Sequence, residues 1–484
     1  MPDNYDIVIG LEVHAELNTH TKVFCACKNE FGTQSNQNTC PVCLGLPGTL
    51  PVLNEEAVRK CIMAGLATGC TIADTAMMDR KNYFYPDLPK AYQISQLYKP
   101  LCENGAVEFD YTASDGEKKH GRVRILRIHL EEDAGKSLHD AWGKSTLLDF
   151  NRCGVPLIEI VTHPDITCPE EAGAFVDALR SILKFAGVSD CKMQEGSLRA
   201  DVNLSVKPAG SGKLGTRTEM KNLNSIRAIV RAAESEARRQ IEELSRGNRV
   251  VQETRRWDDA KGKSLRMRSK EEANDYRYFP DPDLLPIHVS ADMLEDIRQS
   301  LPELPQAKRA RYMAEYGLPE YDASILTSDP EISGFFEETL KHTANIKSVS
   351  NFIMVDMLRI LKERETEFSA VPFPPEHLAQ LIGSVDGGIV NISTAKGVVL
   401  EAMFDGAGSP GEIIDKKGLK QMGDESEILK FVKEVLAENP GPVQQYLAGK
   451  EQVAGFLVGQ VMKKTQGKAK PDAAMRLLKE EMRK

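Results

Sequence analysis

Four cysteines near the N-terminus form the most specific chemical motif of the chain. Cys25 and Cys27 are separated by twelve residues from Cys40 and Cys43. Two close thiol pairs across a short loop are typical of a closed tetrahedral zinc site with a structural role. The alternatives are four unligated thiols or a redox pair, although no thioredoxin-like βαβ pattern surrounds these cysteines. We predict a zinc-binding loop at 25–43.

Acidic side chains recur on the polar faces of several predicted strands. Converging carboxylates repel one another, so a divalent cation is the simplest compensation, and an oxygen-rich shell favours Mg²⁺ or Mn²⁺ over zinc. The alternative is that each acid pairs with an arginine (Arg127, Arg152 or Arg199). The residues concerned are Glu12 and His14 in strand 5–17, Glu131 in 123–132, Glu159 in 157–162 and Asp201 in 198–206.

The segment 79–96 mixes aromatic, basic and polar side chains, among them Lys81 and Tyr83. Loops of this kind stack on nucleic-acid bases or line polar passages. The alternative is an aromatic cluster buried under a loop.

Composition limits the class of protein. The 484 residues include 62 Lys+Arg and 71 Asp+Glu, a net charge of −9, which excludes a protein that coats nucleic acid through bulk positive charge. No apolar run approaches the roughly 20 residues that cross a bilayer, and the N-terminus lacks a signal-peptide core. We therefore expect a cytoplasmic protein without membrane contact, whose ten cysteines are thiols or metal ligands.

Strand and helix patterns alternate up to about residue 290 and helical patterns dominate afterwards, which predicts an α+β protein. Helices are expected at 55–68, 169–186 and 225–246, and a further strand at 146–150. A Gly/Pro-rich stretch at 404–411 marks a second break. We predict a large, mixed or antiparallel β-rich domain (1–292), an all-helical domain (293–407) and a small helical tail (408–484).

The predicted tail carries its own charge character. Residues 462–484 contain eight Lys or Arg against three Asp or Glu, within a chain that is acidic overall. One tail helix could therefore lie on a phosphate backbone, and the alternative is a solvated terminal helix with scattered lysines.

Several nucleotide-binding and hydrolase motifs are missing from the sequence. Three segments, which begin at Gly135, Gly212 and Gly262, imitate the Gly-Lys end of a Walker A loop. That loop needs another glycine five residues earlier, and those positions hold Leu130, Lys207 and Trp257. Neither the serine-hydrolase elbow, the zincin helix nor the protein-kinase motif set occurs. Any use of ATP must therefore depend on a metal and on side chains outside those classes.

Taken together, the motifs resemble the GatB family, the B subunits of aspartyl/glutamyl-tRNA amidotransferases. The resemblance is collinear over nearly the full length. It is carried by Ile9–His14, Asp79–Pro86, His129–Lys136, Pro156–Val161, Glu219–Asn224, Asp275–Pro282 and Gly455–Gln460.

The resemblance implies a reaction, partners and an architecture. A family member uses ATP and Mg²⁺ to convert the side-chain carboxylate of misacylated Glu-tRNA(Gln) or Asp-tRNA(Asn) to an acyl phosphate. Ammonia released from glutamine on an amidase-type A subunit then displaces phosphate, and a small C subunit completes a heterotrimer. The implied architecture is a catalytic cradle domain, a helical domain and a tRNA-contacting tail.

The resemblance also implies residue roles. As Mg²⁺ ligands it implies Glu12, His14, Glu131, Glu159 and Asp201. As further catalytic residues it implies Glu132, Lys81 and Tyr83, of which Glu132 supports the ligands and the other two line the ammonia route or hold phosphates. Arg199 and Lys221 are expected to bind the nucleotide. Zinc occurs in some members only, which implies that Cys25, Cys27, Cys40 and Cys43 are structural.

Two other classes of function stay open at this point. One is a tRNA-binding scaffold protein with structural zinc, in which another polypeptide of the complex performs the chemistry. The other is a standalone metal-dependent hydrolase or nuclease.

Overall fold

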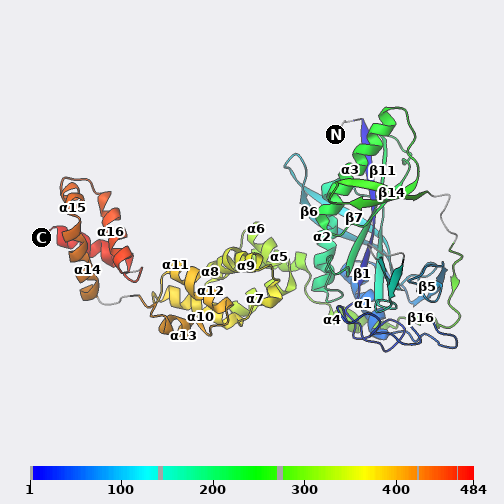
Figure 1. Ribbon diagram of the computed structural model, residues 1–484, viewed down its shortest axis with the longest axis horizontal. Helices are drawn as coiled ribbons and strands as arrows, with labels where there is room; N and C mark the ends of the chain where they lie inside the picture. The colour runs from blue at the N-terminus through cyan, green and yellow to red at the C-terminus, as the bar shows by residue number, and fades with distance from the viewer. Residues whose placement is uncertain (1–3, 140–144, 270–275, 422–424, 466, 484) are drawn as a thin grey trace. The chain divides into compact units, whose positions relative to one another are not determined.

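The computed structural model describes residues 4–139, 145–269, 276–421, 425–465 and 467–483. The chain divides into two compact units, Met1–Pro305 and Gln306–Lys484, here called the N-terminal and C-terminal units. The first is built on a large sheet and the second is helical, which confirms the predicted α+β class (Figure 1).

A nine-stranded sheet forms the centre of the N-terminal unit, in the order β14-β13-β12-β11-β1-β10-β7-β6-β2. All neighbours are antiparallel except β12 and β13. The predicted strands are present, and 5–17 becomes the central strand β1. The bounds are β1 Tyr5–Glu16, β2 Thr71–Ile72, β6 Cys102–Thr112, β7 Lys118–Glu132, β10 Pro156–Thr162, β11 Leu198–Pro208, β12 Thr218–Lys221, β13 Glu253–Asp258 and β14 Lys263–Ser269.

Helices α2 (Pro169–Phe185) and α3 (Ile226–Ser245) pack on one face of this sheet, and α1 (Glu55–Ala67) packs against β6, β7 and α2. The alternation of β1 explains the arrangement, because Ile9, Leu11 and Val13 are buried in the apolar core with the helices. Their neighbours in sequence point to the other face. We call that other side, which carries the polar residues of β1, the open face of the sheet.

A small three-stranded sheet, β15-β4-β5, lies beside the end of β7. The Gln93 side chain of β5 donates a hydrogen bond of 2.7 Å to the Glu132 carbonyl, which ties the two sheets together. Because β4 pairs with β5, Lys81 is carried to the same place. The short strands are β3 Thr75–Ala76, β4 Asp79–Asn82, β5 Tyr92–Ser95, β8 Lys136–His139, β9 Thr146–Asp149, β15 Phe279–Pro280 and β16 Ile287–His288.

Helix α4 (Ala291–Ser300) closes the N-terminal unit and the remaining helices follow it. They form two apolar clusters, and α13 contributes Ile413 and Ile414 to the first, whereas the second begins at Ile428. The helices are α5 Pro305–Tyr316, α6 Glu320–Leu326, α7 Pro330–Leu340, α8 Ile346–Asn351, η2 Phe352–Met357, α9 Leu358–Glu363, η3 Phe368–Ala370, α10 Pro375–Asp386, α11 Ile392–Thr394, η4 Ala395–Val399, α12 Leu400–Phe404, α13 Pro410–Lys416, α14 Glu425–Glu438, α15 Pro440–Leu447, α16 Val453–Lys464 and α17 Pro471–Met482.

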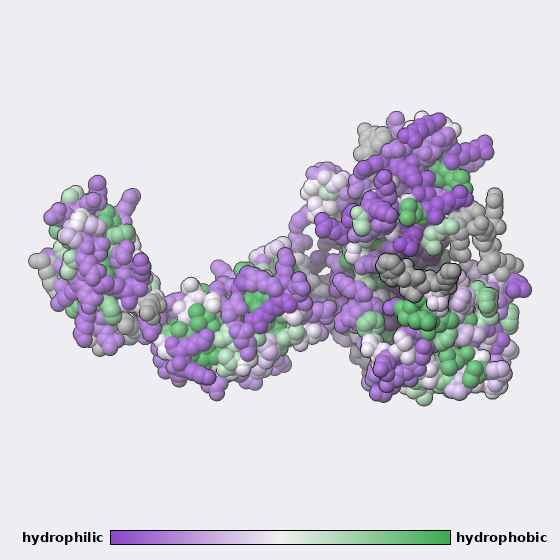
Figure 2. Space-filling view, viewed as in Figure 1, coloured by the Kyte–Doolittle hydropathy of each residue, from purple (hydrophilic) through white to green (hydrophobic). Residues whose placement is uncertain are grey.

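The visible surfaces are mostly hydrophilic, with scattered apolar patches (Figure 2). Among the described residues, no helix combines the length and the apolar character that crossing a bilayer requires.

Candidate active site and cysteine cluster

Strand register brings the predicted ligands together on the open face. His14 of β1 lies opposite Glu159 of β10, which in turn lies opposite His129 of β7. On the other side of β1, Glu12 lies opposite Asp201 of β11. Directly opposed residues share a face of the sheet, so residues distant in sequence meet at one place.

The first group consists of two carboxylates and two imidazoles. The Nε2 atom of His14 lies 3.3 Å from a Glu159 oxygen and 3.7 Å from a Glu131 oxygen. The Nε2 atom of His129 lies 3.5 Å from Glu159 and 3.6 Å from Glu131. Ser95 donates a hydrogen bond of 3.1 Å to Glu131. His14, Glu131 and Glu159 offer ligand atoms within 4.8 Å of one another, close enough to share one cation.

The second group consists of the carboxylates of Glu12, Asp201 and Glu219, whose oxygens also lie within 4.8 Å of one another. The Lys221 ammonium lies 2.5 Å from Asp201 and 2.9 Å from Glu219. Asn203 donates a hydrogen bond of 2.9 Å to Glu12. The five residues predicted as one ligand set thus form two neighbouring groups, because Glu12 and His14 stand on different rows of the sheet.

The two groups differ in how their charge is balanced. In the first, burial opposes ionisation, yet His129 and His14 hold the pKa of Glu159 well below its usual range. Burial lowers the pKa of His129, but Glu159 and Glu131 raise it to about 9. In the second group, burial and the nearby Glu159 and Glu219 raise the pKa of Glu12. The oxygen-rich donor set and this excess of acid fit a divalent cation.

Two adjoining cavities of about 360 and about 330 Å³ open at these groups. Besides Lys221, three cations line the larger one, namely Lys81, Arg127 and Arg217. Within the described part of the chain, none of these three side chains forms an ion pair, and the buried Nε of Arg127 has no hydrogen-bond partner. The larger cavity therefore offers available cations beside two acidic groups. The residues shared by both cavities are His14, Lys81, Asp201 and Lys221.

Lys81 and Tyr83 lie beside the acids. Both line the smaller cavity, together with Glu131. The Lys81 ammonium lies 5.0 Å from the centre of the Tyr276 ring and 5.6 Å from that of Tyr83, and the two rings meet edge to face at 5.7 Å. The segment therefore has both features that were considered: an aromatic cluster, and a cation, Lys81, that lines the cavity.

Glu132 does not join its neighbour Glu131 at these cavities. It pairs with Lys90, accepts a hydrogen bond of 2.9 Å from the Ile94 amide and lines a different cavity beside the cysteine loop. The physical reason is that successive strand residues point to opposite sides. Its predicted catalytic role is therefore not supported by its position.

The two residues predicted to bind the nucleotide already have partners. Arg199 pairs with Asp133 at 2.5 Å, and Lys221 pairs with Asp201 and Glu219. Arg152 also lies 3.4 Å from Asp133. Arg152 and Arg199, two of the three arginines considered as partners for the predicted ligands, thus both contact Asp133, which is not one of those ligands.

Sequence reasoning missed Glu219, which completes the second group, and gave no role to His129 or Arg217. It considered Arg127 only as a possible partner of the acids. In β12, Glu219 alternates with the buried Met220, which is the pattern of a strand with one polar face. The strand has only four residues, too few for this alternation to predict it. Arg217 and Tyr276 lie outside regular strands, so no periodicity could place them at the cavity.

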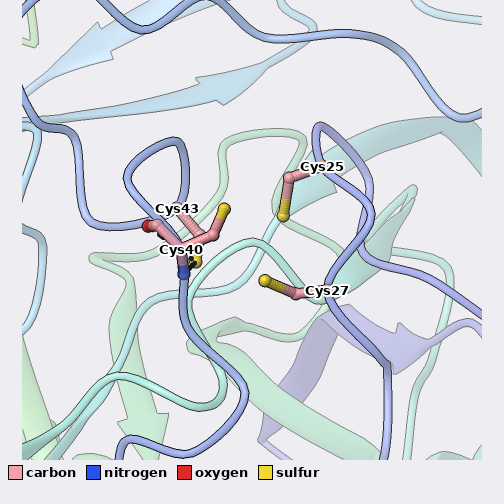
Figure 3. A group of neighbouring side chains, drawn as sticks. All are labelled: Cys25, Cys27, Cys40 and Cys43. Carbon is pink, nitrogen blue, oxygen red and sulfur yellow. Dashed lines mark hydrogen bonds between the residues drawn. The ribbon is translucent and has the colours of Figure 1, made fainter.

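The four predicted cysteines converge on one space, as Figure 3 shows. Their sulfur atoms lie within 4.8 Å of one another, which fits the all-thiol shell of a structural zinc site. The Cys40 amide donates to the Cys43 sulfur at 3.2 Å, and the Lys22 ammonium lies 3.6 Å from the same atom. A hydrogen bond from Cys25, the Cys40 amide and Lys22 together lower the pKa of Cys43 to about 5 despite its burial.

Comparisons with known proteins cover nearly the whole chain. A family model described as the GatB/GatE catalytic domain matches residues 7–295, and one described as the GatB domain matches residues 334–482. The B subunit of the aspartyl/glutamyl-tRNA(Asn/Gln) amidotransferase of Caldicellulosiruptor saccharolyticus is 56% identical over 483 residues, 99% of each chain. The proteins of the same name are 54% identical in Thermoanaerobacter pseudethanolicus (99% of this chain, 100% of the relative) and 51% identical in Agathobacter rectalis (99% of each).

Proposed function

The chain belongs to the GatB family of tRNA amidotransferase B subunits, and on that premise we propose that it activates the amino acid of a misacylated tRNA with ATP. The substrate is Glu-tRNA(Gln), Asp-tRNA(Asn) or both. The chain acts in a heterotrimer with an amidase-type A subunit that releases ammonia from glutamine and with a small C subunit.

The reaction has two steps, phosphorylation of the carboxylate and displacement of the phosphate by ammonia. A side-chain carboxylate oxygen of the tRNA-bound amino acid attacks the γ-phosphorus of ATP, the bond to the β-phosphate oxygen breaks and ADP leaves. The nitrogen of ammonia then attacks the carbonyl carbon of the acyl phosphate, inorganic phosphate leaves and the nitrogen loses a proton. The product is the side-chain amide.

One observation carries the proposal: the larger cavity is lined by the whole second acidic group, by His14 and Glu159 of the first, and by three cations without ion-pair partners among the described residues. Phosphoryl transfer depends on positioning and charge neutralisation more than on covalent help from the protein. Lys81, Arg127 and Arg217 are placed to bind anionic phosphate oxygens, and Arg127 suits two oxygens at once because of its fork of donors.

The acidic groups would hold divalent cations. His14, Glu131 and Glu159 form one such set, and Glu12, Asp201 and Glu219 the other. Mg²⁺ bound there would neutralise phosphate charge and align the transferred group. His129 and Ser95 orient the Glu131 carboxylate from the side.

The smaller cavity supports a route for ammonia. Its wall combines the Tyr83 ring with the Lys81 ammonium, beside Glu131. A polar passage with an aromatic wall admits a small neutral amine, and the leaving phosphate can take the proton that the nitrogen loses.

The test is acyl-phosphate formation by the reconstituted complex carrying Glu12→Gln or Glu159→Gln. Each variant keeps the shape of the side chain and removes one charge of the acidic groups. We expect phosphorylation of misacylated tRNA to fall on the order of 100-fold, while tRNA affinity changes less than about 3-fold. Trapping with hydroxylamine measures the first quantity and filter binding the second.

Glu103→Gln is the matched control, because Glu103 is an exposed residue of β6 in the same sheet. Phosphorylation that survives both active-site changes would favour the scaffold alternative. Turnover of RNA by the isolated chain with Mg²⁺ would instead favour a hydrolase.

A further inference from the structure

A transverse row of residues continues from the acidic cavity across the open face to the edge of the sheet. Glu12 lies opposite Asp201, Lys221 of β12 lies opposite Arg256 of β13, and Arg256 lies opposite Leu265 of β14. The hydrogen-bonded contact between Lys221 and Asp201 joins the two halves of the row. Arg256 and Leu265 therefore share the face on which the acids lie.

The outer end of this row is basic and partly apolar. Arg256 and Lys263 are exposed, and neither forms an ion pair with any residue that the structure describes. Leu265, opposite Arg256 and two residues from Lys263 on β14, is 47% exposed. The carboxylate nearest to them in the register is Asp258, opposite Lys263, and it is held by Lys261 at 3.4 Å.

On the opposite face of the same strands, by contrast, the arginines form ion pairs. Arg255 pairs with Glu253, and Arg266 lies 3.1 Å from the same carboxylate. Arg255 also lies 3.6 Å from Glu236 of α3. Alternation along β13 and β14 thus sorts the paired arginines to the helix side and leaves Arg256 available on the open face.

We propose that the outer row, Arg256, Lys263 and Leu265, receives the single-stranded 3′ end of the tRNA. This inference rests on the proposed function, in which the amino acid esterified to that end reaches Glu12 and Asp201. Strands are spaced about 4.8 Å apart, so Arg256 and Leu265 lie roughly 14 and 19 Å from β1. The unpaired nucleotides that precede the amino acid must cross that distance.

The side-chain chemistry fits an unpaired strand and not a duplex. Exposed cations follow a phosphate backbone, whereas an exposed apolar side chain beside them offers a surface to an unstacked base. In a duplex the bases are stacked inside and would leave Leu265 without a partner. The cations fit any phosphate backbone, and the exposed Leu265 decides in favour of the unpaired 3′ end.

The experiment uses the reconstituted complex with Arg256→Glu or Leu265→Ser. We expect the KM for misacylated tRNA to rise about 10-fold in each, with kcat at saturating tRNA and the KM for ATP within about 2-fold. Arg238→Glu is the control, because Arg238 is exposed on α3, on the other side of the sheet. Thermal unfolding verifies that each variant is folded, and Arg256→Gln replaces Arg256→Glu if it is not.

A tRNA lacking its unpaired 3′ nucleotides provides the second arm. It should bind the wild-type complex more weakly than intact tRNA does, and Arg256→Glu should weaken it no further. Equal weakening of intact and truncated tRNA would overturn the inference by placing a duplex on the row. Loss of a partner protein from the Arg256→Glu complex would overturn it by placing protein there.

The two proposals can fail separately. A wild-type complex that forms no acyl phosphate contradicts the proposed function. A wild-type complex that forms it, with an unchanged KM for tRNA in both variants, contradicts the inference alone.

Discussion

At the scale of single residues, strand register brings carboxylates close enough together to repel one another. Five carboxylate ligand candidates stand on five neighbouring strands, and their mutual repulsion is only partly relieved by His14, His129 and Lys221. The repulsion that remains contributes to the raised pKa of Glu12, because burial and the neighbouring acids both favour the neutral form of this side chain. A divalent cation would balance this excess of negative charge.

The cysteine cluster gives a prediction at the same scale. Cys40→Ser removes one thiol of four, and a three-thiol site should hold zinc much more weakly. We expect metal analysis to find about one zinc per wild-type chain and less than roughly 0.2 in the variant, with a lower melting temperature. Cys168→Ser, outside the cluster and half-buried, should keep its zinc. Equal zinc content in both variants would contradict the site.

At the scale of elements, the long amphipathic strands could be predicted and their partners could not. The alternation of Ile9, Leu11 and Val13 predicted β1 and its polar face, because burial on one side leaves a period of two in the sequence. The division of the ligands into two groups depends on pairing between β1 and β11, which are far apart in the sequence. No local pattern contains that register, and Glu219 was missed for the same reason.

Helices α5 and α7 give a prediction about pH. Glu337 accepts from Lys308 at 2.8 Å and from Arg311, and although burial opposes it, these partners hold its pKa below 4.5. The unfolded chain then binds more protons, so the stabilisation is present above about pH 4.5 and is lost as the pH falls through the folded value. Glu337→Gln should be less stable than wild type at pH 7 by at most about 1 kcal/mol, since the pair is partly exposed.

Calorimetry of the full chain between pH 3.5 and 7 measures that difference, which should shrink towards the acid end. Glu338→Gln is the neighbouring control, because its exposed carboxylate pairs with Lys341 at the helix end. A difference that stays constant with pH would mean that packing, not charge, explains the loss.

At the scale of the whole molecule, the change from strands to helices near residue 290 was visible in the sequence, whereas the division inside the helical part was predicted from composition alone. A Gly/Pro-rich stretch suggested a division after residue 407. Helix α13 nevertheless buries Ile413 and Ile414 in the same cluster as the preceding helices. Glycine and proline mark turns, and a turn within a core has the same composition as one between cores. The division 1–292, 293–407 and 408–484 stays a prediction.

The charge of the tail leads to a prediction that takes α13 into account. Among the described tail residues, Lys464 is paired with Glu434 and Glu438, and Arg476 is paired with Glu425. The described tail cations of 462–484 without such a pair are Lys463, Lys468, Lys470, Lys479 and Arg483. Each phosphate that they neutralise adds about 0.9 to the slope of log affinity against log salt.

Deleting residues 425–484 leaves α13 and its cluster intact and removes these cations. We expect tRNA binding by the complex to weaken and the salt slope to flatten by about 2 to 4, the change that roughly two to five neutralised phosphates give at about 0.9 each. The amidase-type partner should stay bound, and kcat at saturating tRNA should persist, since the acidic groups lie in the N-terminal unit. Unchanged tRNA affinity at every salt concentration would mean that the tail lysines serve only solubility, and the contact with phosphate would have to be sought on the sheet.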